Sequence, residues 1–153
     1  MAEIWDYRIS STTAARLAGI QYTKLNYWLK TGVVPFAAPM PGSGYRRSFS
    51  FADILRIKAV VKLRAERVPL QTVRKAIEAL TELWDIEDPL LWSSRMVIAG
   101  HEIFWALDDV VLLEVLTEQL ASKPLVVVPL GEIKKELEGQ WTEAVANGVF
   151  LFA

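Results

Sequence analysis

Apolar residues recur at helical spacing in a short segment near the N-terminus, residues 22–30. Leu25, Trp28 and Leu29 fall on one face of a helix over this segment, because residues three and four apart are neighbours on a helix surface. The outer face is polar, basic and aromatic, and it consists of Thr23, Lys24, Asn26, Tyr27 and Lys30. A short helix with one apolar stripe and such an outer face suits the major groove of DNA.

A first helix is predicted directly before this segment, and Gly19 breaks it. We expect Ser11 or Thr12 to cap its N-terminus, because a hydroxyl there accepts hydrogen bonds from amides that lack a helical partner. Arg16 lies near the exposed face of this helix, where it either contacts a phosphate or is solvated. The two helices together predict a helix-turn-helix.

The next segment, residues 33–51, is rich in proline and continues into Gly42-Ser43-Gly44, a turn signal between residues that can extend. It predicts a β-hairpin wing. The tip carries a phenol and two guanidinium groups able to bond phosphate oxygens, namely Tyr45, Arg46 and Arg47. Phe49 and Phe51 are expected to seat the wing on the helical core.

Two further helices are predicted after the wing. Ser50 and Asp53 have the spacing of a capping box, opening a helix that runs to about Glu66. Its apolar positions are expected to face inward and its basic positions outward; these are Ile54, Ile57 and Val61, and Arg56, Lys58 and Lys62. Pro69 begins the next helix, whose apolar face holds Val73, Ile77, Leu80 and Trp84.

At these residues the sequence resembles the MerR family of winged helix-turn-helix regulators. The resemblance rests on Ala15 and Gly19, on Leu25, Tyr27 and Trp28, on Gly32-Val33-Val34-Pro35 and on Gly44-Tyr45-Arg46-Arg47. It covers about residues 7–80 and implies binding of double-stranded DNA. The family commonly has Arg where this chain has Asn26, which exchanges a phosphate contact for an amide that can pair with adenine. After Trp84 the chain has Asp85-Ile86-Glu87-Asp88-Pro89 and no sustained heptad, so the family's coiled-coil dimerisation helix is not predicted.

The second half has a different pattern. Residues 95–109 predict two strands about the turn Ala99-Gly100, and residues 124–129 predict another short strand. Residues 110–120 fit a helix capped by Asp109, and a last helix ends near Asn147-Gly148. The predicted fold class is therefore α+β, with a winged helix-turn-helix domain at 1–84 and a small acidic α+β module at 90–153.

The two halves of the chain carry opposite net charges. Residues 1–75 carry 13 Lys and Arg against 4 Asp and Glu, a balance of +9, whereas residues 76–153 carry 4 against 14, a balance of −10. The basic half suits the phosphate backbone, and the acidic half is better placed to meet protein.

Composition excludes several kinds of site. The chain has no Cys and one His, so thiolate sensing of metals or redox state is excluded and we expect no metal or other cofactor. His101 beside Glu102 is interpreted as structural. No nucleophile with its base and no phosphate-binding loop is recognisable, so an enzyme is not predicted. The chain lacks a secretory signal and a long apolar run, and we expect a cytoplasmic protein that does not contact the membrane.

Aromatic residues are frequent in the second half. Trp84, Trp92, Trp105 and Trp141 are favoured as core or subunit interface over a ligand pocket. The apolar tail should also pack internally or against a partner. The residues predicted for a dimer or partner interface are Trp105, Trp141, Phe150 and Phe152.

The leading functional hypothesis is a sequence-specific regulator that binds double-stranded DNA as a homodimer. The second hypothesis is an antitoxin that represses its own operon and neutralises a toxin. It rests on the strand and helix order of residues 90–153, which is similar to a region of antitoxin-like proteins paired with PIN-domain ribonucleases.

Overall fold

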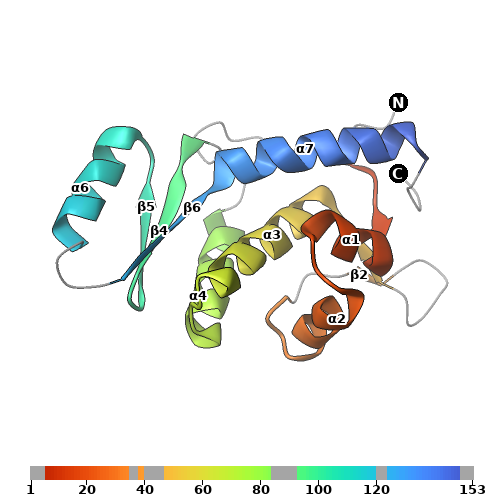
Figure 1. Cartoon of the computed structure of the whole chain (residues 1–153), viewed down its shortest axis with the longest axis horizontal. Helices are drawn as coiled ribbons and strands as arrows, with labels where there is room; N and C mark the ends of the chain where they lie inside the picture. The colour runs from red at the N-terminus through yellow and green to blue at the C-terminus, as the bar shows by residue number, and fades with distance from the viewer. Residues whose placement is uncertain (1–5, 35–37, 40–46, 84–92, 120–123, 149–153) are drawn as a thin grey trace. The chain divides into compact units, whose positions relative to one another are not determined.

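The computed structural model describes residues 6–34, 38–39, 47–83, 93–119 and 124–148 (Figure 1). The fold mixes helices and strands, which confirms the predicted α+β class. The chain forms two compact units, residues 1–61 together with 136–153, and residues 62–135. This division differs from the predicted boundary between 1–84 and 90–153, because the end of the last helix packs with the N-terminal helices.

The first unit begins with a strand that leads directly into the two predicted helices. Its elements are β1 (Ile9–Ser10), α1 (Ser11–Ala18), α2 (Tyr22–Lys30), β2 (Ala38–Pro39), β3 (Arg47–Phe49), most of α3 (Phe51–Ala65) and the C-terminal part of α7 (Leu130–Ala146). The order of helix, helix, hairpin and helix confirms the predicted layout of this half.

The N-cap of α1 is Ser10, not Ser11 or Thr12 as predicted. The Ser10 hydroxyl accepts a hydrogen bond from the Thr13 amide at 3.3 Å. Ser10 is the last residue of β1 and keeps extended backbone angles, which is the conformation that a capping residue needs. Because β1 ends at Ser10, this residue rather than Ser11 or Thr12 has the extended conformation and caps the helix.

A small antiparallel sheet carries the base of the wing. The strand order is β1-β3-β2, and Ser48 pairs with Ser10 on one side and with Ala38 on the other. Phe49 and Phe51 are fully buried, which confirms that they seat the wing on the helical core. Residues 40–46 lie outside the described residues.

The predicted capping box at the start of α3 is present. The Ser50 amide donates to the Asp53 carboxylate at 2.9 Å, and the Asp53 amide donates to the Ser50 hydroxyl at 3.2 Å. This reciprocal pair satisfies two amides that the helix leaves without partners. It fixes the point at which the chain leaves the wing and enters the most buried helix of the unit.

Two basic residues of α3 that were predicted to face outward are mostly buried. The side chains of Arg56 and Lys58 are only 12% and 11% exposed, and they pair with Asp53 at 3.4 Å and with Glu136 at 3.1 Å. A buried charge requires such a partner. Helical spacing alone does not show whether a basic residue has a partner, so it did not predict that Arg56 and Lys58 are buried. Burial lowers the pKa of the Arg56 guanidinium, which Asp53 partly offsets.

Asp53 gives a testable dependence of stability on pH. Burial raises the pKa of its carboxyl above the ordinary value of 3.8, although Ser50, Arg56 and Arg8 favour the charged form. Because the folded pKa is raised, the stability that this group contributes is fully present below 3.8 and is lost as pH rises through the folded value. We expect the stability of wild type relative to Asp53→Asn to fall over this window.

The fall should be about 1.4 kcal/mol for each unit by which folding raises the pKa. Urea unfolding of both proteins at a series of pH values from 4 to 7 measures it, with Glu78→Gln, an exposed change on α4 (Leu70–Leu83), as the control. A difference between wild type and Asp53→Asn that stays constant over this range would show that Asp53 does not titrate differently in the folded state.

Helix α7 completes the core of the first unit. Trp141 is fully buried and meets Phe51 edge to face, with ring centroids 5.4 Å apart and an interplanar angle of 82°. Leu137 and Ala144, one turn to either side, are also buried. The prediction placed Trp141 at an interface; the structure instead makes it a core residue, because Phe51 already covers it.

The second unit is a small sheet with flanking helices. Its elements are α4 (Leu70–Leu83), β4 (Arg95–Ala99), β5 (Glu102–Ala106), α6 (Asp109–Gln119) and β6 (Leu125–Pro129). The strand order is β5-β4-β6 and both pairings are antiparallel. Central strand β4 is almost entirely buried, and α6 lies against β5 (Figure 1).

Two local predictions in this unit are shifted by one residue. Ala99 pairs with Glu102, so the hairpin turn is Gly100-His101 rather than Ala99-Gly100, and Gly100 has a φ of 62°. The cap of α6 is Asp108, whose carboxylate accepts from the Val111 amide at 2.9 Å. Asp109 instead pairs with Arg95 at 2.7 Å. Because Asp108 and Asp109 are adjacent and of the same type, the sequence does not show which of them caps α6. The ion pair of Asp109 with Arg95, a contact between residues distant in sequence, leaves Asp108 as the cap.

Candidate nucleic-acid interface

Helices α1 and α2 form the predicted helix-turn-helix. Gly19 ends α1 with a φ of 75° and donates its amide to the Arg16 carbonyl, while the Ile20 amide reaches the Ala15 carbonyl. A residue in this left-handed conformation is usually glycine, because a Cβ would be strained there. The chain then turns within three residues and starts α2 at Tyr22.

The inner and outer sides of α2 are those predicted. Leu25, Trp28 and Leu29 are buried. On the outer side Thr23, Lys24, Tyr27 and Lys30 are exposed, and Asn26 is half-buried. Tyr27 is 58% exposed, so its ring and hydroxyl are accessible on this face.

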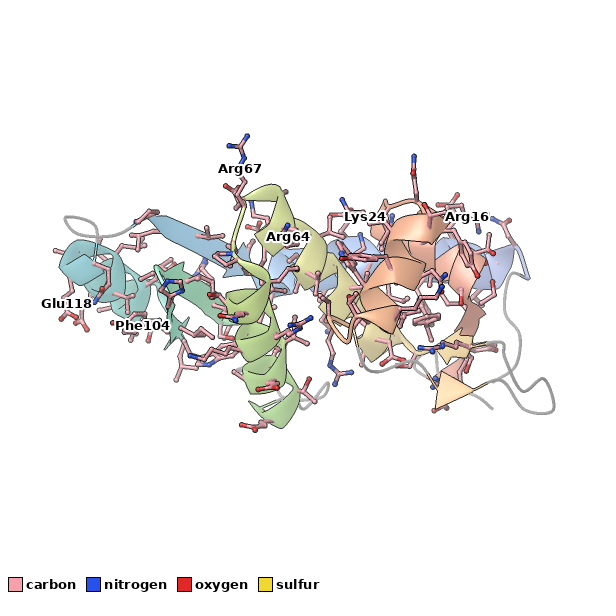
Figure 2. The ribbon with its side chains drawn as sticks, turned by 90° about the horizontal axis from the view of Figure 1, so that it is seen from below. Arg16, Lys24, Arg64, Arg67, Phe104 and Glu118 are labelled. Atoms are coloured by element: carbon pink, nitrogen blue, oxygen red, sulfur yellow. The ribbon has the colours of Figure 1, made fainter. Side chains whose placement is uncertain are left out.

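Lys24 is held in place by its own helix. Its ammonium lies 5.5 Å from the centroid of the Trp28 ring, within the range of a cation–π interaction. This contact restricts the lysine stem and keeps the charge beside α2. Arg16 projects from the neighbouring helix α1 (Figure 2), where it is exposed. Arg16 also borders a hollow of about 340 Å³ with Glu143 of α7, and that carboxylate weakens the case for a phosphate contact.

The wing contributes one described candidate. Arg47 is exposed at the first position of β3, opposite Pro39. Tyr45 and Arg46 lie outside the described residues, so their predicted phosphate contacts stay predictions. Arg8, which was not predicted as a site residue, links β3 to the start of α3. Its guanidinium donates a hydrogen bond to the Ser48 hydroxyl at 2.8 Å and lies 3.7 Å from the Asp53 carboxylate.

Charge is of one sign along the sequence segment that forms α1, α2 and the wing. Residues 7–52 contain six Lys or Arg and no Asp or Glu. The next residue, Asp53, is buried beneath Arg8 and Arg56. A surface of one sign attracts the phosphate backbone over a distance of several ångströms.

Two candidates were missed from the sequence. Gln21 is exposed at the N-cap of α2, and its side chain makes no capping hydrogen bond. Tyr22, the first residue of the helix, is 51% exposed. The N-terminal residues of a recognition helix are those that reach base edges, and this rule would have identified both once the helix start was known.

The predicted interface residues fall in different environments. Trp105 is half-buried on β5, whereas Trp141 is in the core of the first unit. Phe150 and Phe152 lie outside the described residues.

Other kinds of site find little support in the described part of the chain. No group of three or more His, Asp or Glu gathers there in a way that could hold a metal ion. His101 is exposed in the β4–β5 turn, with Nδ1 3.2 Å from the Thr72 hydroxyl, a contact that ties this turn to α4. None of the described helices has the length and hydrophobicity required to span a membrane.

Comparison with known proteins agrees with this geometry. Residues 9–80 match the MerR HTH family regulatory protein. An uncharacterized HTH-type transcriptional regulator of Mycobacterium bovis is 38% identical over 81 residues, which are 52% of this chain and 35% of that protein. Proteins of the same description from two strains of Mycobacterium tuberculosis match with the same identity and coverage.

The chain thus spans about a third of the length of these relatives. The matched residues include α1, α2, the strands of the wing and α3, and extend to Leu80 in α4. Residues 9–80 therefore form a domain of the MerR HTH family of transcriptional regulators.

Proposed function

We propose that this protein is a transcriptional regulator that binds specific sites in double-stranded DNA as a dimer. The observation that carries the proposal is the outer face of α2, where Lys24, Lys30 and Tyr27 are exposed on a helix whose other side is buried. The match of residues 9–80 to the MerR HTH family also supports the proposal.

The dimensions of α2 suit the major groove. Its nine residues make a rod about 13 Å long, and the groove is about 12 Å wide. We assign phosphate contacts to Lys24, Lys30 and Arg47, since ammonium and guanidinium groups bond phosphate oxygens. We assign base contacts to Asn26, with Gln21 as a second amide at the helix start, because amides pair with adenine in the groove.

Dimerisation follows from how few base pairs one short helix can read. Two copies related by a two-fold axis read two half-sites, usually about 10 base pairs apart from centre to centre. Doubling the contacts raises specificity to the level that a regulator needs among competing genomic sites. We therefore expect palindromic target sites.

Gel shifts on DNA from around its own gene and on random DNA test the proposal. Specific binding should be at least about 1000-fold tighter than binding to random DNA. The logarithm of affinity should fall against the logarithm of salt concentration with a slope of about −0.9 for each phosphate contacted. Equal affinity for selected and random duplexes at every salt concentration would reject sequence specificity.

The two kinds of contact should respond differently to substitution. Replacing both Arg46 and Arg47 with Ala should weaken binding to all sequences and reduce the salt slope by about 1 for each lost phosphate contact. Asn26→Ala should instead cost about 1–3 kcal/mol at particular base pairs. Affinities for a panel of single-base variants of the site measure both effects. If Asn26→Ala instead lowers the affinity for every variant of the site by the same factor, Asn26 does not read particular bases.

The antitoxin hypothesis gains no support from the family match or from the names of the relatives, which are those of regulators. The same names favour a regulator over an enzyme.

A further inference from the structure

The wing is joined to the helical core through a very short connection. β3 ends at Phe49 and α3 begins at Phe51, so Ser50 alone separates the strand from the helix, and its backbone sets the angle between them. The strands of the wing sheet have only two or three residues each, whereas strands usually have about 3–10. Few ladder hydrogen bonds hold such a sheet, so the direction of β3 depends on contacts across this corner.

Arg8, which directly precedes β1, reaches both sides of the corner. On the strand side its guanidinium donates to the Ser48 hydroxyl at 2.8 Å and to the Ser48 carbonyl at 3.0 Å. On the helix side it lies 3.7 Å from the Asp53 carboxylate. Ser48 is fully buried, and the side chains of Arg8 and Asp53 are 24% and 7% exposed. One planar side chain thus connects the strand to the first turn of the helix.

The helix end of this connection is itself fixed. The Ser50 amide donates to the Asp53 carboxylate at 2.9 Å, and the Arg56 guanidinium, one turn further along α3, lies 3.4 Å from the same carboxylate. Charge-assisted contacts of this kind are strong and directional. Because α3 holds Asp53 from its own side, a strand tied to Asp53 through Arg8 is tied to the helix.

Arg47 depends on this arrangement because it is the residue before Ser48 in β3. Successive side chains of a strand point to opposite faces. Arg8 holds the Ser48 side chain inward, so Arg47 faces outward, and it is exposed whereas Ser48 is buried. A shift of β3 by about 1 Å would take a hydrogen bond between Arg47 and a phosphate beyond its usual range.

We propose that Arg8 is a positioning residue for DNA binding. It fixes the angle between β3 and α3, and thereby the place of the Arg47 guanidinium against the phosphate backbone. Its own Nε and Nη2 groups are engaged by Ser48 and Asp53, so it acts through Arg47. The inference rests on the phosphate contact that the proposed function assigns to Arg47.

A double-mutant cycle with Arg47 is the first test. Arg8→Ala alone should weaken binding to the specific duplex about 10-fold, but by less than about 2-fold when Arg47 is already replaced with Ala, because effects of residues that act through one another are not additive. Fluorescence anisotropy of the wild type, the two single variants and the double variant gives the cycle. An equal effect of Arg8→Ala in both backgrounds, or none in either, would overturn the proposal.

Arg8→Lys separates geometry from charge. A lysine keeps the positive charge but lacks the planar fork of donors that reaches several acceptors at once, so binding should still fall about 5-fold or more. Binding by Arg8→Lys as tight as that of wild type would mean that only the charge of Arg8 matters. A positioning role would then be wrong.

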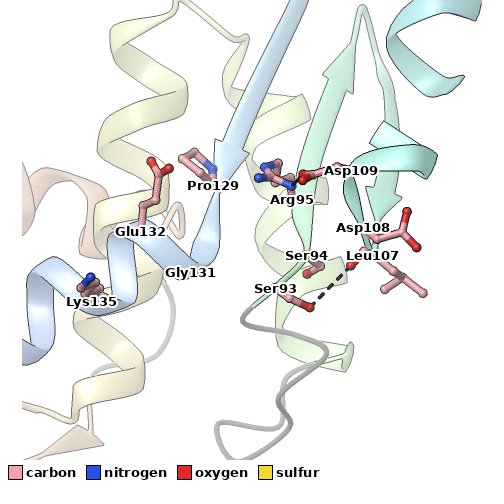
Figure 3. A pocket seen from close by; sticks show the side chains of 10 residues that line it. All are labelled: Ser93, Ser94, Arg95, Leu107, Asp108, Asp109, Pro129, Gly131, Glu132 and Lys135. Atoms are coloured by element: carbon pink, nitrogen blue, oxygen red, sulfur yellow. Dashed lines mark hydrogen bonds and ion pairs between the residues drawn. The ribbon is translucent and has the colours of Figure 1, made fainter. Parts of the chain in front are cut away.

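Arg95 supplies a matched control in the second unit. It also joins a strand to the first turn of a helix, with its guanidinium 2.7 Å from the Asp109 carboxylate of α6 (Figure 3). Arg95→Ala makes the same change of side chain and net charge at a residue without an assigned DNA contact. It should alter the affinity by less than about 2-fold, because salt screens charges that lie far from the DNA. Equal weakening by Arg8→Ala and Arg95→Ala would assign the effect to net charge and contradict the proposal.

Amide hydrogen exchange examines the wing without DNA. In Arg8→Ala the amides of β3 should exchange about 10-fold faster than in wild type, because local opening of the strand costs less free energy. The amides within α2 should exchange as in wild type. A uniform increase over β3 and α2 would show that Arg8 stabilises the whole unit, and it would contradict a specific role at the corner.

These measurements separate the inference from the proposed function. If the wild type binds a specific duplex and Arg47→Ala weakens that binding, an additive cycle with Arg8→Ala overturns only the inference. If the wild type binds no duplex specifically while exchange in β3 still depends on Arg8, only the proposed function fails, and Arg8 keeps its role in fixing the strand.

Discussion

Replacing Lys24 and Lys30 together with glutamate should weaken binding to duplex DNA by about 100-fold or more. Each change removes a favourable contact with the backbone and adds a repulsive one, on a face that has no acidic residue to begin with. The salt slope should fall by about 1.8, since two phosphates are no longer neutralised. Fluorescence anisotropy over a series of salt concentrations gives the affinity and the slope in one experiment.

The matched control is Arg74→Glu with Lys75→Glu, an equal change of charge on exposed positions of α4. Circular dichroism should show the α2 variant folded, because both lysines are exposed and only the contact of Lys24 with Trp28 is lost. If both pairs of substitutions weaken binding equally, total charge rather than α2 is responsible, and the assignment of the interface fails.

Trp141→Ala should destabilise the first unit by about 3–5 kcal/mol, the usual cost of removing a fully buried large aromatic side chain. Part of this is the edge-to-face contact with Phe51, and the rest is a cavity beneath α7. Because a domain of this size is stable by only about 5–15 kcal/mol, a substantial share of the protein should unfold at moderate urea concentrations.

Urea unfolding followed by far-ultraviolet circular dichroism measures this loss. Trp141→Phe should retain most of the stability, and Thr142→Ala, an exposed change at the next residue, should be nearly neutral. Loss of less than about 1 kcal/mol in Trp141→Ala would mean that α7 is not part of the core of the first unit.

The elements that sequence reasoning placed well are those specified by nearby residues. The apolar positions of α2 are three and four residues apart, Gly19 breaks the preceding helix, and Ser50 and Asp53 cap each other within one turn. The β4–β5 hairpin was also predicted, because two short apolar segments that can form strands flank a single glycine. Each of these signals lies within a few residues of the structure that it specifies.

The predictions that failed depend on contacts between residues distant in sequence. Arg56 seemed to belong to an exposed face, but Asp53 and the surrounding core cover it. Trp141 is separated from Phe51 by 90 residues, and no local pattern shows that the last helix joins the first unit. The exposure of Val110 and Leu113 on α6 was missed for the opposite reason: an apolar helix is expected to be buried, and only the structure shows that one side is not.

The candidate interface was predicted more completely than the rest of the chain. Lys24, Tyr27 and Lys30 were placed on the outer face from periodicity alone, and they are exposed. Gln21 and Tyr22 were missed because their importance depends on the residue at which α2 begins. A helix start is a boundary, and boundaries are less sharply specified than the helix itself.

The central claim is that the outer face of α2 lies in a groove of duplex DNA, and photo-crosslinking from that face tests it most directly. A benzophenone amino acid in place of Tyr27, which is exposed in the free protein, should form covalent links to bases of the specific duplex and few to a random duplex. The same amino acid in place of Leu113, which is equally exposed on α6, should form none. Cross-links from position 113 but not from position 27, in a protein that still binds the duplex, would contradict the account.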